Sequence, residues 1–240
     1  MNRDVFSQVL RHIQLIILDL DYLVFDCALL KVQSVRESMI SLADVIPQNV
    51  RLPGFAEAED GFRDHGFRWV QHLEIGLDEQ ALDHLQRAYT LHENRLIESG
   101  HAGLFPGMEQ FIANCRRANM TVALGADASR DYLMAVSDRH QLDHLFQFTL
   151  STDEFGMGDA DEMMLEMMRQ AEVNPSETLV LGTRPHTFQA AHGLDLLTIG
   201  CGWGLRRHEG LAEADLRAPA LSDLFPAIEQ ADNLALQKLG

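Results

Sequence analysis

The sequence predicts an α/β fold, a doubly wound parallel Rossmann-like sheet with an α-helical domain inserted after its first strand. Short apolar runs of strand length alternate with stretches of helical length. This alternation is typical of a parallel sheet that is covered by helices on both faces. The first apolar run departs from the rhythm, because a long interval of helical character separates it from the second. We therefore expect one core domain that is interrupted by one insertion.

The expected strands of the core are short, apolar and bounded by polar or turn-forming residues. In chain order they are Gln14–Leu18, Met120–Leu124, Phe146–Leu150, Thr178–Leu181 and Asp195–Ile199. Helices are expected between them at Met108–Ala118, Arg130–His140 and Asp161–Ala171. The last of these helices carries a stripe of methionines, which more often fills a core than forms a binding surface. They are Met163, Met164, Met167 and Met168.

The interval after the first strand is expected to be helical throughout, at Leu29–Val45, Gly54–Glu74 and Asp78–Glu98. An insert in this position is a candidate cap for the carboxyl edge of the sheet, where parallel sheets bind ligands. The predicted core comprises residues 1–26 and 104–240, and the predicted cap comprises residues 27–103.

Composition excludes several classes of protein. The net charge of −17 argues against a nucleic-acid partner and against an anionic membrane surface, which would both repel the chain. No apolar stretch is long enough for a membrane span, and the amino terminus lacks a signal-peptide pattern. The scattered cysteines Cys27, Cys115 and Cys201 suggest reduced thiols and a cytoplasmic location.

The first strand ends in two carboxylates, Asp19 and Asp21, with one residue between them. Side chains alternate along an extended segment, so both acids are expected on the same side. Crowded negative charge calls for a metal ion, a shared proton or a neighbouring cation. The pair is therefore either a nucleophile and a general acid around a cation, or two exposed acids where a strand meets a loop.

Residues 18–26, Leu-Asp-Leu-Asp-Tyr-Leu-Val-Phe-Asp, resemble the first motif of the haloacid dehalogenase (HAD) superfamily, D-x-D-G-T-L-hydrophobic-D. The resemblance is closest to the phosphoglycolate-phosphatase-like branch with a helical cap. It continues in the same order through four further segments, at residues 104–107, 176–182, 190–193 and 202–204. Almost the whole chain is covered, and the implied fold is a HAD-like core with a cap.

The resemblance also implies a phosphohydrolase. In this family the first Asp attacks phosphorus to form an aspartyl-phosphate, and the second protonates the leaving group and then activates water. Mg²⁺ is held by the first Asp, the backbone carbonyl of the second and a later Asp. Carried onto this sequence, Asp19 is the nucleophile and a Mg²⁺ ligand, and Asp21 is the acid/base and offers its carbonyl. Phosphoryl transfer of this kind depends on positioning and on compensation of charge.

The other functional positions depart from the family pattern. The Gly-Thr after the second Asp is replaced by Tyr22-Leu23, and the Ser or Thr that ends the second motif is replaced by Ala126. The third motif corresponds to residues 155–162, which contain no lysine. The only lysines of the chain, Lys31 and Lys238, lie elsewhere.

In the fourth motif the third metal ligand is replaced by Thr183, and Thr187 or a neighbour replaces the later acid. We therefore expect Mg²⁺ binding to be weakened, since an anionic ligand is gone. Arg184 follows the missing ligand directly, and a guanidinium can engage both oxygens of a carboxylate. We expect Arg184 to reach Asp19 or Asp21 and to take over the charge of the metal. The alternative is a solvent-exposed loop arginine.

Three further residues are candidates for ligand contact or charge compensation: Ala126, through its backbone, Asp127 and Arg130. An Arg in the position of Arg130 more often decorates the start of a helix. Two functions remain open. One is a phosphatase-like hydrolase of a small phosphorylated molecule with impaired activity. The other is a catalytically degenerate protein that binds a ligand or a protein partner, or has a regulatory role.

Overall fold

A computed structural model describes residues 3–44, 51–73, 77–155, 159–206 and 208–238. The chain divides into two compact units. Unit 1 comprises Met1–Phe25 with Leu104–Gly240, and unit 2 comprises Asp26–Gly103. The first boundary lies one residue before the predicted one. Phe25 pairs with Leu104 within unit 1, whereas the N–H group of Asp26 donates to the carbonyl of Gly103 within unit 2.

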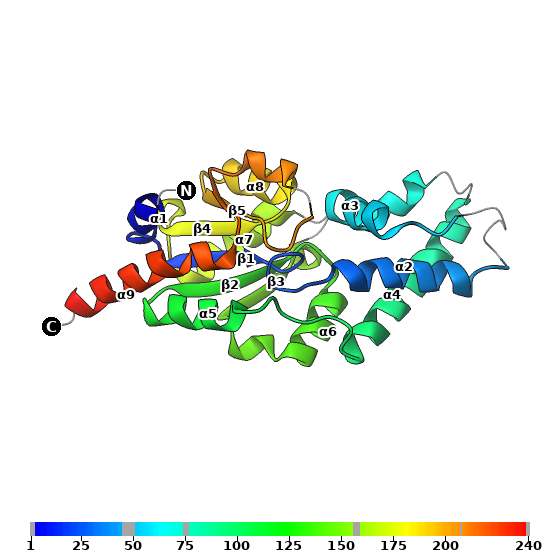
Figure 1. The fold of residues 1–240 in the computed structure, drawn as a ribbon, viewed down its shortest axis with the longest axis horizontal. Coiled ribbons are helices and arrows are strands. Elements are labelled where there is room, and N and C mark those ends of the chain that lie inside the picture. The colour runs from blue at the N-terminus through cyan, green and yellow to red at the C-terminus, as the bar shows by residue number, and fades with distance from the viewer. Residues whose placement is uncertain (1–2, 45–50, 74–76, 156–158, 207, 239–240) are drawn as a thin grey trace. The chain divides into compact units, whose positions relative to one another are not determined.

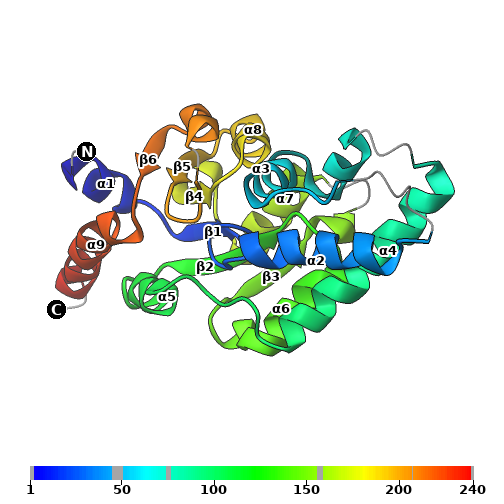
Figure 2. The same ribbon diagram turned by 45° about the vertical axis from the view of Figure 1, so that its right-hand side comes forward.

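Unit 1 is built on a parallel sheet in which β1 has β2 on one side and β4 on the other. The strand order is β3-β2-β1-β4-β5-β6, so β4, β5 and β6 extend from the side of β1 that is opposite to β2 and β3 (Figure 2). The strands are β1 (Leu15–Asp19), β2 (Thr121–Ala126), β3 (Phe148–Ser151), β4 (Thr178–Gly182), β5 (Leu197–Cys201) and β6 (Leu216–Ala218). The α/β fold class predicted from the sequence is confirmed.

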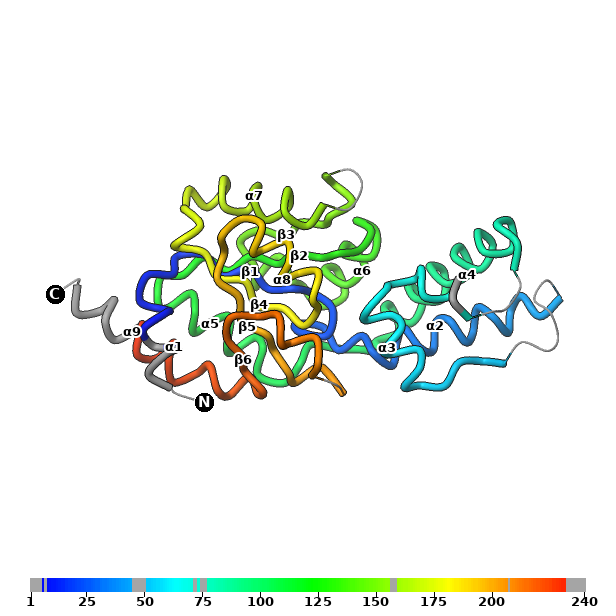
Figure 3. Tube along the Cα trace, turned by 90° about the horizontal axis from the view of Figure 1, so that it is seen from above, coloured from blue at the N-terminus to red at the C-terminus, as the bar shows by residue number. Residues whose placement is uncertain are grey.

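Helices cover both faces of this sheet, and Figures 1 and 3 show α7 and α9 on opposite sides of the strands. Helix α7 packs on β1, β2 and β3, while α8 packs on β4 and β5. The helices at the two ends of the described chain, α1 and α9, lie side by side (Figure 2). The helices of unit 1 are α1 (Arg3–Leu10), α5 (Met108–Arg117), α6 (Arg130–His140), α7 (Ala160–Ala171), α8 (Pro185–Gly193) and α9 (Phe225–Lys238).

The core between the sheet and α7 forms because β1 is buried on both faces and α7 turns its methionine stripe inward. Leu15 and Ile17 of β1 pack with Ala123 of β2 and with this stripe. Each of the stripe's methionines is at most 5% exposed, so their predicted role as core residues is confirmed: Met163, Met164, Met167 and Met168. This packing fixes where the carboxyl ends of β1 and β2 lie relative to α7.

Unit 2 is helical in its described residues, with α2 (Ala28–Ser41), α3 (Phe55–His65) and α4 (Glu79–Glu98). Its core gathers Val35 of α2, Phe62 of α3 and Tyr89 of α4, together with Trp69. The helix predicted from Gly54 is shorter than expected. Gly66 has a φ of 56°, which ends α3, and a 3₁₀ helix (Gly66–His72) follows. The predicted helix ends at Val45 and Glu74 lie outside the described residues.

Strand β6 was not predicted. It has three residues at the edge of the sheet and pairs only with β5 among the described strands. An edge strand of this length does not need the apolar run of a central strand, so its sequence carries no strand signal. The predicted strands β1, β2, β3 and β5 begin one or two residues later than expected, since periodicity sets the ends of an element less sharply than its centre. Among the described residues, no helix combines the length and apolar character that crossing a membrane requires.

Candidate functional site

The candidate site lies in unit 1 at the carboxyl ends of β1, β2 and β4. Asp19 is the last residue of β1, and Asp127 directly follows β2. Arg184 follows the end of β4 and stands immediately before α8. Parallel pairing of β1 with β2 and with β4 brings these three ends to one edge of the sheet. The topology therefore gathers the acidic and basic side chains that the sequence singled out.

Asp19 and Arg184 form a buried ion pair. The guanidinium donates through Nη2 to both carboxylate oxygens of Asp19, at 2.8 and 3.0 Å, and through Nε to Oδ2 at 3.1 Å. The two residues are only 5% exposed each. Thr187, in the first turn of α8, adds a hydrogen bond of 3.1 Å to the same Oδ2 atom. Both oxygens of Asp19 therefore have donors from within the protein.

The loop after β4 places Arg184 for this contact. Pro185 occupies the first position of α8, where its fixed φ favours the start of a helix and its missing N–H group is not needed. Arg184 precedes it in an extended conformation, and its carbonyl accepts from the N–H group of Thr187. Arg184 and Thr187 therefore face the same carboxylate from the N-cap and the first turn of α8.

Asp127 extends the pair to a cluster. Its Oδ2 atom lies 3.4 Å from Nη1 of Arg184 and 3.0 Å from Nε2 of His186, and its Oδ1 atom accepts from Thr152 at 3.3 Å. The hydrogen bond from His186 and the charge of Arg184 together outweigh burial and lower the pKa of Asp127 to about 2. Asp127 is thus an anion over the whole physiological range.

Burial affects the two members of the central pair differently. Burial raises the pKa of the Asp19 carboxyl, and the charge and hydrogen bonds of Arg184 oppose this rise. Burial alone would lower the pKa of Arg184, but attraction from Asp19, Asp127 and Asp21 outweighs it and raises that pKa. Arginine is protonated even in water, so Arg184 is a permanent cation here.

Asp21 lies beside this cluster and has different partners. The hydroxyl group of Tyr132 donates to its Oδ1 atom at 2.7 Å, and the hydroxyl of Thr183 donates to its backbone carbonyl at 3.4 Å. Tyr132 is in the first turn of α6, and its N–H group is capped by the side chain of Ser129. Asp21 is 6% exposed, and it is held by one residue of α6 and one residue of the loop after β4.

The chain turns sharply after Asp21. Tyr22 has a φ of 63°, in the left-handed region that favours glycine, and the motif that this segment resembles has glycine at the corresponding position. The N–H group of Tyr22 donates to the carbonyl of Phe25, and Leu20 accepts from Val24 and Phe25. The tyrosine ring is buried at 1% exposure. These contacts hold a non-glycine residue in a conformation that costs about 1–2 kcal/mol.

The residues present do not fit Mg²⁺. Mg²⁺ binds oxygen atoms in octahedral geometry, usually through one or two carboxylates whose oxygens are free to coordinate it, together with water. Both oxygens of Asp19 accept from Arg184 or Thr187, the residue at 183 is neutral, and its hydroxyl engages the Asp21 carbonyl. No group of three or more His, Cys, Asp or Glu among the described residues could hold a metal ion.

Two predicted candidates, Ala126 and Arg130, contribute less to the site than Asp127 does. Ala126 ends β2 and is buried at 1%, so its methyl group occupies the place of a hydroxyl without supplying one. Arg130 begins α6 as an exposed residue, and its N–H group donates to Asp153 at 3.4 Å. The described contacts do not bring its guanidinium to Asp19 or Asp21. Part of the third motif, residues 156–158, lies outside the described residues.

The sequence did not single out Tyr132, and it left His186 either as a ligand contact or as a simple loop histidine. Thr187 was placed in the fourth motif, but its hydrogen bond to Asp19 was not predicted. The available signal was position, because Tyr132 lies in the first turn of the helix after β2 and Thr187 lies in the first turn of the helix after β4. Side chains in such turns lie at the same sheet edge as the strand ends.

One small cavity lies beside Asp19. A cavity of about 20 Å³ lies between the strand ends and α7, and its lining includes Asp19, Gly125, Met163 and Arg184. A cavity needs roughly 10–15 Å³ to hold one water molecule. This cavity is large enough for one water molecule and too small for a phosphoryl group.

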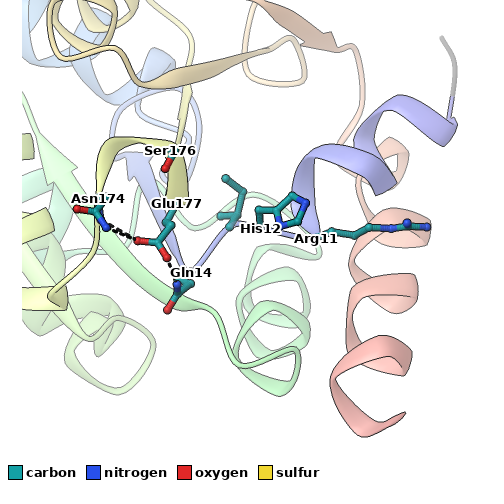
Figure 4. Close-up of a pocket in the computed structure, with 7 residues that line it drawn as sticks. Arg11, His12, Gln14, Asn174, Ser176 and Glu177 are labelled. Carbon is teal, nitrogen blue, oxygen red and sulfur yellow. Dashed lines mark hydrogen bonds between the residues drawn. The ribbon is translucent and has the colours of Figure 1, made fainter. Parts of the chain in front are cut away.

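A second hollow, of about 640 Å³, lies at the amino ends of β1 and β4 (Figure 4). Its polar groups bond to one another, since Glu177 accepts from both Gln14 and Asn174. Figure 4 shows Arg11 pointing away from Glu177. This hollow therefore lacks the convergent polar groups that are typical of a ligand site.

Comparisons with known proteins agree with the fold. Residues 16–201 match the sequence model described as haloacid dehalogenase-like hydrolase. The chain is 23% identical to phosphoglycolate phosphatase from Vibrio vulnificus over 91% of this chain and 97% of that protein. It is 30% identical to phosphoserine phosphatase from Thermus thermophilus, over 59% of this chain and only 58% of that relative.

A solved structure shares the architecture at lower identity. CbbY from Rhodobacter sphaeroides, in complex with xylulose-(1,5)bisphosphate, superposes with a TM-score of 0.71 at 19% identity. The match covers 88% of this chain and 99% of CbbY. At this identity the likeness concerns the fold, while the chemistry depends on the side chains described above.

Proposed function

Because the chain belongs to the haloacid dehalogenase-like hydrolase family, we propose that it is a phosphatase-like member whose hydrolysis of small phosphoesters through Asp19 is strongly impaired. Its fold then serves to bind a ligand or partner, or to regulate, more than to turn substrate over. One observation carries this proposal. Both oxygens of Asp19, the nucleophile position, already accept hydrogen bonds from Arg184 and Thr187.

An engaged carboxylate is a poor nucleophile. Attack on phosphorus requires a free oxygen that is aligned with the leaving group, at near-contact distance. Arg184 would have to withdraw from Asp19 before such an attack, and this would leave a buried carboxylate without its counter-ion. Breaking a buried pair in this way costs about 3–5 kcal/mol. The ground state of the site is thus stabilised against the reaction.

Charge in the site also opposes a phosphorylated substrate. Asp19, Asp21 and Asp127 face one guanidinium and the imidazole of His186. A phosphoester adds further negative charge, and the family's compensating lysine has no counterpart in the sequence of the third motif. Removing one preorganised electrostatic contact commonly costs about 10²–10³ in rate, and the effects of several losses are not simply additive.

The direct test is a phosphatase assay on a panel of small phosphoesters with Mg²⁺, using purified wild-type protein beside Asp19→Asn. We expect wild-type turnover to be indistinguishable from that of the variant. A catalytically intact phosphatase of the same family, assayed in parallel, establishes that the panel and buffer support turnover. Robust wild-type hydrolysis that disappears in Asp19→Asn would falsify the proposed impairment.

A further inference from the structure

Arg184 occupies the positions around the Asp19 carboxylate that a bound metal ion would need. Its Nη2 and Nε atoms lie 2.8–3.1 Å from the two oxygens of Asp19, on a side chain that is 6% exposed. Its Nη1 atom reaches toward Asp127 at 3.4 Å. A single guanidinium therefore supplies the positive charge for two carboxylates at the edge of the sheet.

Position 183 adds a second observation. The hydroxyl of Thr183 lies 3.4 Å from the carbonyl oxygen of Asp21, and Thr183 is 1% exposed. A carboxylate on this side chain would lie beside that carbonyl and face the same edge as Asp19. Thr183 and Arg184 are neighbours in one loop. Because the residue at 183 is neutral, the single positive charge of Arg184 compensates Asp19 and Asp127 without a further buried anion beside them.

We propose that Arg184 is a built-in cation which excludes divalent metal ions from this site, and that Thr183 and Arg184 together are the switch between a metal-free site and a metal-binding one. The proposal rests on the proposed function, since both concern the same carboxylates. The ligand class is a hard divalent cation, Mg²⁺ or Mn²⁺. The ligands in the converted protein are Asp19, the carbonyl of Asp21 and an acid at 183.

The experiment compares metal binding by wild-type protein and by the double variant Thr183→Asp/Arg184→Ser. Mn²⁺ binding is measured by electron paramagnetic resonance, and the melting temperature is measured with and without Mg²⁺. We expect no Mg²⁺-dependent shift in the wild type. In the double variant we expect a rise in melting temperature, and Mn²⁺ affinity that is higher by more than about tenfold.

Two controls assign the result to this site. Adding Asp19→Asn to the double variant removes a ligand and is expected to abolish the gain in Mn²⁺ binding. The single variant Asp19→Asn measures Mn²⁺ binding by other surface acids, which are numerous at a net charge of −17. Mn²⁺ binding by the wild type that Asp19→Asn abolishes overturns the proposal, as does a folded double variant that gains none.

A second pair of variants keeps the test decisive if the double variant does not fold. Arg184→Lys keeps a cation at this position, while Arg184→Gln removes the charge and keeps much of the length. We expect Arg184→Gln to bind Mn²⁺ more tightly than Arg184→Lys, and equal binding overturns the proposal. The outcome is separate from the phosphatase assay. Turnover that persists with a chelator refutes the proposed impairment alone, whereas wild-type metal binding without turnover refutes the built-in cation alone.

Discussion

The hydroxyl group of Tyr132 donates a 2.7 Å hydrogen bond to the carboxylate of Asp21, between the first turn of α6 and the loop after β1. The Tyr132 side chain is buried, at 4% exposure. An acid/base group must exchange protons with a substrate, but this carboxylate oxygen is instead engaged by the protein. The contact fixes the rotamer of Asp21 and adds to the rigidity of the site.

Replacing Tyr132 by phenylalanine removes this donor and keeps the ring. We expect the free energy of unfolding to fall by about 1.5–3 kcal/mol, because the hydrogen bond is made to a charged group. Urea unfolding measures the change. In an Asp21→Asn background the same substitution should have a clearly smaller effect, and an equal loss in both backgrounds would show that the effect arises elsewhere.

Arg184→Ala leaves a buried carboxylate without its counter-ion, so we expect a loss of about 3–5 kcal/mol in the free energy of unfolding. The matched control is Arg169→Ala. Arg169 makes a similar two-bond contact with Glu166, but its side chain is 74% exposed. Solvent screens that pair, so we expect little change. Similar losses from both substitutions in chemical denaturation would contradict the buried role of Arg184.

The stability that Asp127 contributes should depend on pH. Its pKa is about 2 in the folded protein and 3.8 as the ordinary value. The folded state therefore favours the ionised form, and the contribution is fully present above about pH 4 and is lost as the pH falls toward 2. The comparison is urea unfolding of wild type and Asp127→Asn from neutral pH to about pH 3. The wild-type advantage should shrink over the lowest part of this range, and an advantage that grows there would contradict this assignment.

Gly204 packs against the turn that follows Asp21. A Cβ atom at this position would lie 1.8 Å from the carbonyl oxygen of Tyr22, a backbone atom that cannot move freely. Gly204→Ala is therefore expected to destabilise unit 1 by about 1–3 kcal/mol, as overpacking commonly does. Gly193→Ala is the control, because a Cβ atom on Gly193, at the end of α8, would meet no described atom within 4 Å. Equal melting temperatures for the two variants would contradict the close contact.

Much of unit 1 could be predicted because its signals are local. The β1 run is apolar at every position until Asp19, and α6 was predicted with its observed bounds, Arg130–His140. The end of α3 could not be predicted from periodicity, since it depends on the left-handed conformation of Gly66. Three residues of β6 at a sheet edge carry too little pattern to be distinguished from a loop.

The sequence predicted which charged groups form the site, but not how they are arranged. Two acids at a strand end and an arginine after another strand indicate an ion pair, and the structure selects Asp19 as the acid that Arg184 engages. Tyr132 and Thr187 reach the site from helices that are distant in sequence, and only the packed sheet brings them there. The cytoplasmic location and the exclusion of nucleic acid stay predictions from composition.

The ion pair of Arg184 with Asp19 also constrains how this sequence can change over generations. A substitution that removes Arg184 alone leaves a buried charge unpaired. An acid at 183 alone loses the hydrogen bond to the Asp21 carbonyl and adds a buried anion where Arg184 already serves two carboxylates. Either change taken first is therefore expected to be unfavourable, although the two together restore a plausible ligand set. Such coupling between neighbouring positions is epistasis. It places a barrier that single substitutions do not easily cross between this metal-excluding site and one with an acid at 183.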